Sequence, residues 1–182
     1  VKYGIFGIQA ARKIGGQRCT SCEFVSFSSQ DGLMLKGLLM KSNQSKGTVI
    51  LTHGYQGNKE SMLPFANFLV KNGYDVFFFD HRAAGESEGD IISMGYYERY
   101  DVLGAVDYLQ SRNDIHPQLY GVGLSMGAAA LVFAQHEAPV FNALVLDGLY
   151  PSIHQNIARR AYHIYSVPKY PIATVLTFFG GL

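Results

Sequence analysis

The sequence of 182 residues has little charge, few cysteines and no long apolar run. Only 16% of its residues are charged, and a net charge of +1 gives no reason to expect nucleic acid as a partner. No window reaches the roughly 18 consecutive apolar residues of a membrane-spanning helix. The hydrophobic share of 48% is ample for a packed core, which argues against intrinsic disorder.

The two cysteines, Cys19 and Cys22, stand in the short sequence Cys-Thr-Ser-Cys. One pair cannot form a disulfide framework, and no second pair is present to complete a four-cysteine zinc site. We expect ordinary reduced thiols, which favours a reducing compartment and hence the cytoplasm. The sequence shows no metal-ligand cluster and no phosphate-binding loop, so it implies neither a metal nor a cofactor.

Charge is unevenly distributed along the chain. Four basic residues precede the first acidic residue, Glu23, and three follow the last one, Asp147. Such flanks are compatible with contact to a membrane surface or with simple solvation. Neither flank is a dense cluster of lysine and arginine, so membrane contact is possible but not indicated. The oligomeric state is not addressed by the sequence.

From Glu23 onward, hydrophobic periodicity predicts alternating strands and helices. Apolar segments on both sides of the Asp31-Gly32 turn predict a β-hairpin over 23–41. The later elements are buried strands at 48–52, 75–79, 118–122 and 143–146, and helices at 61–72, 96–110 and 126–136. This alternation with short connections predicts an α/β fold with a doubly wound, mostly parallel sheet.

The pattern changes after Asp147. The sequence from Tyr150 predicts a helix capped by Ser152, and no further strand pattern follows. We therefore divide the chain into an N-terminal extension (1–22), an α/β core (23–149) and the start of a lid or cap segment (150–182). Aromatic residues of the last segment either line an apolar acyl pocket or pack on the sheet; they are Tyr162, Tyr165, Tyr170, Phe178 and Phe179.

The most informative motif is Gly123-Leu124-Ser125-Met126-Gly127, which fits G-x-S-x-G at the junction of a predicted strand and helix. In so tight a turn, larger side chains two residues before and after Ser125 would collide with their surroundings. The serine hydroxyl would stand above the sheet, with the N–H groups of a helix N-terminus facing any oxyanion formed there. The alternative is a glycine-rich turn in which Ser125 merely caps the helix.

A second motif, Thr52-His53-Gly54-Tyr55-Gln56-Gly57, follows the predicted strand 48–52. It places a turn of small residues at the carboxyl end of a neighbouring strand. An acyl-transfer enzyme needs its second oxyanion donor at this place, and we expect the backbone N–H of Tyr55 to lie beside that of Met126.

Together with the segment Asp80-His81-Arg82-Ala83-Ala84-Gly85-Glu86-Ser87, these motifs resemble the α/β-hydrolase superfamily. The resemblance covers about residues 23–150 and is strongest to serine hydrolases of the esterase, lipase and serine-aminopeptidase kind. It departs from the family where Ala83 replaces the usual glycine. It implies that Asp80 and Arg82 fix the loop beside the active site. It also implies that His53 organises its loop, since the family's base follows the nucleophile in sequence.

The resemblance also implies partners for Ser125, because a serine hydroxyl needs a histidine base and a carboxylate that holds this base. In the family, both follow strands that the 182 residues do not contain, and two more strand–helix units need about 60 residues. We therefore expect a sheet that is incomplete at the C-terminus, with its last two strands missing. Candidates within the chain are Asp147 as the acid and, as the base, His116, His136, His154 or His163.

These motifs predict a serine hydrolase that cleaves a small-molecule ester or amide through an acyl-enzyme on Ser125. The N–H groups of Tyr55 and Met126 would stabilise the oxyanion. Esters are favoured, because amide cleavage demands more protonation of the leaving group. We expect the 182-residue chain alone to be inactive. The alternative is a truncated or inactive binding module that uses the pocket above Ser125 and Tyr55.

Overall fold

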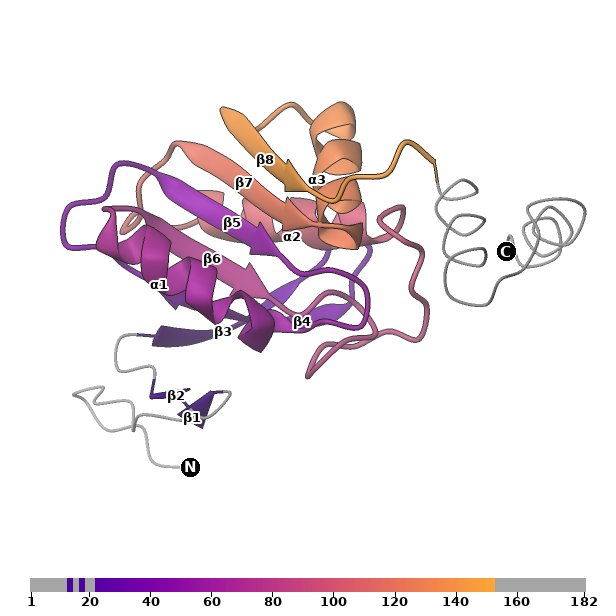
Figure 1. The fold of residues 1–182 in the computed structure, drawn as a ribbon, viewed down its shortest axis with the longest axis horizontal. Helices are drawn as coiled ribbons and strands as arrows, with labels where there is room; N and C mark the ends of the chain where they lie inside the picture. Colours follow the sequence, from indigo (N-terminus) through magenta and orange to yellow (C-terminus); the bar gives the residue numbers. More distant parts are fainter. Residues whose placement is uncertain (1–12, 15–16, 19–21, 153–182) are drawn as a thin grey trace, which may run out of the picture. The chain divides into compact units, whose positions relative to one another are not determined.

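The computed structural model describes residues 13–14, 17–18 and 22–152 (Figure 1). The chain divides into two compact units, Val1–Asp147 and Gly148–Leu182. All helices and strands given below belong to the first unit. Most of the predicted N-terminal extension and nearly all of the predicted lid segment, with its aromatic residues, lie outside the described residues.

A six-stranded sheet in the order β3-β4-β6-β5-β7-β8 forms the core. Its strands are β3 (Cys22–Ser28), β4 (Met34–Met40), β5 (Thr48–Thr52), β6 (Asp75–Phe79), β7 (Leu119–Leu124) and β8 (Ala143–Asp147). The hairpin β3–β4 is antiparallel and pairs antiparallel with β6, whereas β6, β5, β7 and β8 run parallel. A separate antiparallel pair joins β1 (Lys13–Ile14) and β2 (Gln17–Arg18). The predicted N-terminal hairpin and mostly parallel sheet are thus confirmed.

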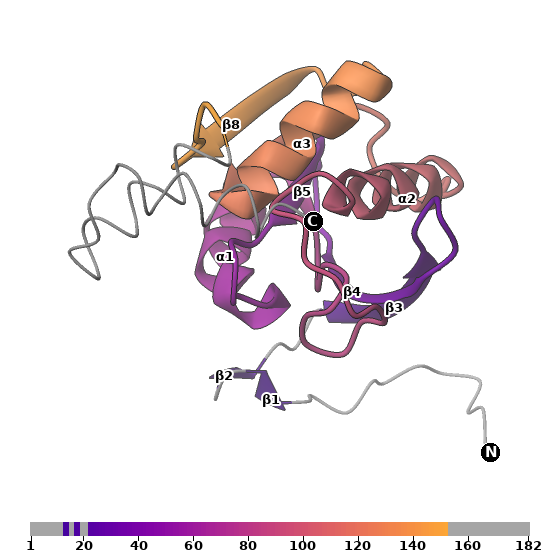
Figure 2. The ribbon, with the colours of Figure 1, turned by 90° about the vertical axis from the view of Figure 1, so that its right-hand side faces the viewer.

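Helices cover both faces of the six-stranded sheet. The 3-10 turn η1 (Lys59–Met62) leads into α1 (Leu63–Lys71) on one face, and α2 (Glu98–Gln110) and α3 (Met126–Glu137) lie on the other (Figure 2). Strand β6 shows how the two layers share the sheet. Its Phe77 packs in the core beneath α2 and α3, while its neighbour Phe78 packs in the core beneath α1. A strand buried on both faces is typical of a doubly wound sheet.

One expectation from the sequence is wrong. Cys22, the first residue of β3, is disulfide-bonded rather than a reduced thiol. The expectation of a cytoplasmic location depends on reduced thiols, and it therefore loses this support.

Candidate active site

Ser125 lies in the turn between β7 and α3 with a strained backbone. Its φ of +51° and ψ of −110° fall in a region that side-chain-bearing residues rarely adopt. Its N–H donates to the carbonyl oxygen of Asp147 over 2.7 Å, and its carbonyl oxygen accepts from the N–H of Ala129 over 3.1 Å. The hydroxyl makes no capping hydrogen bond to α3. Helix capping therefore does not account for this serine.

The two glycines of the motif are required by close backbone contacts. A Cβ atom on Gly123 would lie 2.7 Å from Cα of Ala128, and one on Gly127 would lie 2.6 Å from the carbonyl oxygen of Thr52. Neither neighbour can move aside, because both contact atoms belong to the main chain. The sequence expectation that larger side chains would collide at these two positions is met, and the absence of Cβ lets α3 approach the end of β5.

The loop that follows β5 passes directly against Ser125. A Cβ atom built on Gly54 would lie 3.4 Å from Cβ of Ser125, an ordinary contact distance. Among the residues that the structure describes, the backbone N–H groups of Tyr55 and Met126 donate no hydrogen bond. The tyrosine side chain is exposed. Tyr55 follows Gly54 and Met126 follows Ser125, so an unpaired N–H group lies directly after each of the two residues in contact.

His53 is buried and uses both of its ring nitrogens. Nδ1 lies 2.8 Å from the carbonyl oxygen of Gly54, and Nε2 accepts from the backbone N–H of His81 over 3.0 Å. These partners assign the proton to Nδ1. Burial, reinforced by the nearby His81, lowers the pKa of His53 to about 4. The ring is therefore neutral and tied to its own loop, as a loop-organising role requires.

Asp80 anchors the segment that follows β6. Oδ1 accepts from the backbone N–H of Lys59 over 2.7 Å, and Oδ2 accepts from the Lys59 ammonium over 2.5 Å and from the N–H of Glu86 over 2.9 Å. Burial opposes the lysine charge, but the hydrogen bonds to Asp80 and Glu86 outweigh it and raise the pKa of Lys59. Sequence reasoning did not identify Lys59, because nothing local signals a partner that lies 21 residues away.

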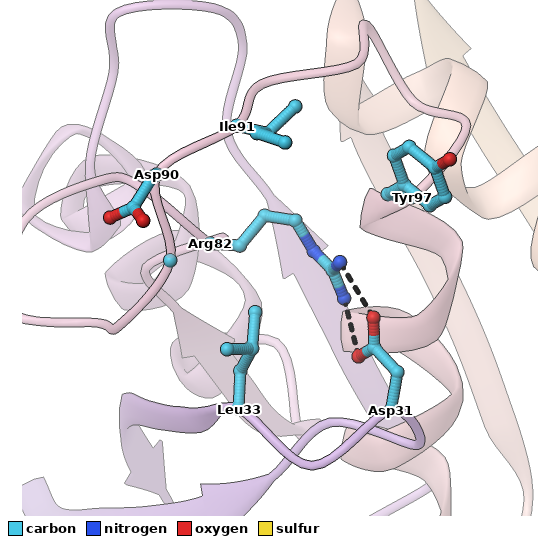
Figure 3. Close-up of a pocket in the computed structure, with 7 residues that line it drawn as sticks. Asp31, Leu33, Arg82, Asp90, Ile91 and Tyr97 are labelled. Carbon is cyan, nitrogen blue, oxygen red and sulfur yellow. Dashed lines mark hydrogen bonds and ion pairs between the residues drawn. The ribbon is translucent and has the colours of Figure 1, made fainter.

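Arg82 is held by two carboxylates. Its guanidinium makes a bidentate pair with Asp31 over 2.8 and 2.7 Å (Figure 3), and its Nε and one terminal nitrogen donate to Oδ1 of Asp101 over 2.9 and 2.8 Å. Burial disfavours this charge, but the two carboxylates outweigh it and raise the pKa of Arg82, which in turn lowers the pKa of Asp31. The pair with Asp31 lies in a pocket of about 330 Å³, whose apolar lining includes Leu33, Ile91 and Tyr97.

The histidine candidates on the described part of the chain lie at the wrong ends of their elements. His116 precedes β7 whereas Ser125 follows it, and six strand residues separate their ends by about 20 Å. His136 lies in the last turn of α3, about 16 Å along the helix from Ser125. Neither histidine can reach the serine. His154 and His163 lie outside the described residues.

The acid candidate, Asp147, is the last residue of β8. Its backbone carbonyl oxygen contacts Ser125 through the hydrogen bond already noted, and its side chain is exposed. Within the described ranges no group of histidine, cysteine, aspartate and glutamate side chains is arranged to hold a metal ion. No helix in those ranges has the length and hydropathy that crossing a membrane requires.

Comparison with known proteins gives a family match over most of the chain. The family model described as "Serine aminopeptidase, S33" matches residues 43–170. "Uncharacterized protein YqkD" of Bacillus subtilis is 29% identical over 151 residues, which are 81% of this chain and 49% of the relative. "Thiohydrolase aneE" of Aspergillus aculeatus is 33% identical over 114 residues, 60% of this chain and 36% of the relative. The chain spans about half the length of curated relatives such as YqkD.

A solved structure agrees with the family match. The esterase Pf2001 of Pyrococcus furiosus superposes with a TM-score of 0.75 at 27% identity, over 89% of this chain and 63% of that chain. The superposition shows that the two chains share the fold described above over most of this chain. Since the family match extends over more than half of the residues, the chain belongs to the serine aminopeptidase S33 family of the α/β-hydrolase superfamily.

Proposed function

We propose that the protein containing this chain is a serine hydrolase that cleaves small ester or amide substrates, with Ser125 as its nucleophile. The observation that carries this proposal is the strained backbone of Ser125 at a strand-to-helix turn. Strain of this kind persists only where the surrounding structure enforces it, and it concentrates at functional sites. A serine with no capping bond is also available for attack on a substrate carbonyl.

The oxyanion would be held by the backbone N–H groups of Tyr55 and Met126. Both lack a partner among the described residues, and the loop carrying Tyr55 contacts Ser125. The N–H of Met126 also belongs to the first residue of α3, where the helix dipole favours negative charge. Fixed donors of this kind stabilise a tetrahedral intermediate more than the substrate itself, which raises kcat.

The reaction would proceed in two steps. In the first, Oγ of Ser125 bonds to the carbonyl carbon while its proton passes to a histidine base, and the carbonyl oxygen takes up the negative charge. The bond to the leaving group then breaks as the base returns the proton. In the second step, water adds to the acyl-enzyme while the same base takes its proton. The bond from Oγ of Ser125 to the carbonyl carbon then breaks, the base returns the proton to Oγ, and the acid product leaves.

We place the histidine base and its carboxylate in the part of the protein that follows Leu182. Two observations support this placement. The described strand β8 pairs only with β7, and its Val145 is 62% exposed, although parallel strands are normally covered on both faces. The curated relatives are about twice as long as the matched region. Asp147 remains the alternative acid, because its strand end adjoins Ser125.

Substrate class follows from the relatives rather than from the pocket. One similar structure is an esterase and one similar curated protein is a thiohydrolase. Esters and thioesters also need less protonation of the leaving group than amides. An ester or thioester of a small molecule is therefore the proposed substrate.

Labelling with a fluorophosphonate probe tests the nucleophile. In the full-length protein we expect covalent labelling at Ser125, lost in Ser125→Ala and retained in Ser111→Ala, which alters an exposed serine at the end of α2. Removal of a serine nucleophile is expected to lower kcat on a p-nitrophenyl ester by about 10⁴-fold or more. A folded full-length protein that takes up no probe would contradict the proposal and would favour a binding module.

A further inference from the structure

A line of buried hydrogen bonds joins α2 to the loop that contacts Ser125. Oδ2 of Asp101 accepts from the backbone N–H of Arg82 over 2.9 Å and lies 3.3 Å from Nδ1 of His81. The backbone N–H of His81 donates to Nε2 of His53 over 3.0 Å, and Nδ1 of His53 donates to the carbonyl oxygen of Gly54 over 2.8 Å. Because Asp101, His81 and His53 are each at most 1% exposed, water does not compete for these bonds. We name these three residues the relay.

The last bond of the relay fixes the direction of a backbone N–H group. The carbonyl oxygen of Gly54 accepts from His53 and also from the N–H of Gly57 over 2.9 Å. In a planar trans peptide the C=O and N–H bonds point in opposite directions. Holding the oxygen of Gly54 therefore also holds the N–H of Tyr55, which belongs to the same peptide group.

The proton on Nδ1 of His53 depends on the bond at the other ring nitrogen. While Nε2 accepts from the N–H of His81, the ring must carry its proton on Nδ1. If that donor turned away, the proton could move to Nε2. A lone pair on Nδ1 would then face the carbonyl oxygen of Gly54, and the loop would lose one of its two anchors.

Asp101 fixes the segment that supplies this donor. It accepts from the backbone N–H of Arg82, from the ring of His81 and twice from the Arg82 guanidinium. Nε2 of His81 has no hydrogen-bond partner within the described part of the chain. Asp101 is therefore the side-chain anchor of the His81 ring as well as of the backbone at Arg82.

We propose that Asp101 is a positioning residue for the oxyanion hole, acting through His81 and His53 on the peptide group that carries the N–H of Tyr55. The inference rests on the proposed function, because the N–H of Tyr55 matters only if it stabilises an oxyanion. Removing one oxyanion donor costs about 10²–10³-fold in kcat. Misdirecting a donor that remains present should cost less, about 10–100-fold, with KM little changed because the donor acts on the transition state.

Asp31 provides a matched control for Asp101. Both carboxylates bind the Arg82 guanidinium, but the other side chain bound to Asp31 is the hydroxyl of Ser29, and Asp31 has no bond to His81 or to the backbone of Arg82. The experiment compares Asp31→Asn and Asp101→Asn in the full-length protein. We expect both variants to lower the urea midpoint. Only Asp101→Asn should slow fluorophosphonate labelling and lower the kcat of ester turnover, by about 10–100-fold. In Asp31→Asn the labelling rate and kcat should stay within about twofold of the wild type.

His53→Phe keeps a ring of similar size but removes both nitrogens. We expect a similar loss in kcat, and the double variant with Asp101→Asn should be no slower than the slower single variant, because both changes break the same line of bonds. If the fold losses in labelling rate of the two single variants multiplied in the double variant, the inference would be overturned. Equal slowing of labelling in Asp31→Asn and Asp101→Asn would also overturn it. If Asp101→Asn fails to fold, an unchanged kcat in His53→Phe would also overturn it. A wild-type protein that takes up no probe would instead contradict the proposed function itself.

Discussion

The two sides of Ser125 are built very differently. On the side of β5 and β6, the loops at 53–57 and 80–87 are fixed by buried side chains, with Asp80, His81 and Asp101 all inaccessible to solvent. On the side of β8, the described strand has one unpaired edge and exposes Val145. The half of the site assigned to oxyanion binding is therefore held by residues of this chain alone. The other half, on the side of β8, would supply the base, and the described residues provide no histidine there.

The largest expected effect tests that division directly. We expect the isolated 182-residue chain to show no measurable hydrolysis of p-nitrophenyl esters, because an oxyanion hole without a base leaves Ser125 a poor nucleophile. The full-length protein, assayed under the same conditions, is the positive control. Ser125-dependent turnover by the 182-residue chain would mean that the base lies within these residues, with His154 and His163 as its candidates.

A second expectation concerns the buried ion pair on the fixed side. Lys59→Met leaves the carboxylate of Asp80 buried without its lysine, which should lower the free energy of unfolding by about 3–5 kcal/mol. Lys41→Met breaks an exposed pair with Asp114 and should cost less than about 1 kcal/mol. Urea denaturation of both variants provides the measurement. Equal losses would show that burial does not distinguish the two pairs.

A smaller effect should appear as a pH dependence of stability. The folded protein protonates His53 only below its pKa of about 4, whereas an unfolded histidine binds a proton below about pH 6.5. Between these values the unfolded chain binds more protons, so stability should fall as the pH is lowered, by up to about 3 kcal/mol in total. The other ionisable groups near the ring are His81, Asp80 and Asp101. Urea denaturation at pH 7 and pH 4.5 provides the measurement.

His53→Phe is the control for this pH dependence, because the variant lacks the titrating ring. Its stability should change less between pH 7 and pH 4.5 than that of the wild type. An identical slope in both proteins would show that His53 does not carry the effect.

What could be predicted from the sequence was local. The turn at Ser125 and the loop at Tyr55 were both located from short spacings, because glycine near a strand end has a direct steric meaning. The strand and helix ranges also agree with the structure to within a few residues, since hydrophobic periodicity reports burial within one element.

What could not be predicted depends on long-range pairing. The residues next to Asp101 in the sequence give no sign that it differs from an ordinary solvated aspartate on a helix. In the structure it is nevertheless completely buried against Arg82. The sequence predicts a turn at Asp31, and the arginine that pairs with this aspartate lies 51 residues away. Only the resemblance to a family predicts that Asp80 and Arg82 fix their loop, and it names none of the partners that the structure gives them. Charge pairs of this kind become visible only after the sheet has brought their elements together.

The double pairing of Arg82 also has a consequence for how the protein opens. One guanidinium connects the turn between β3 and β4, the segment after β6 and the helix α2. The hairpin at the edge of the sheet cannot separate alone without leaving a buried positive charge short of one partner. The hairpin and α2 should therefore lose amide protection together in native-state hydrogen exchange, as one cooperative unit rather than as a fraying edge.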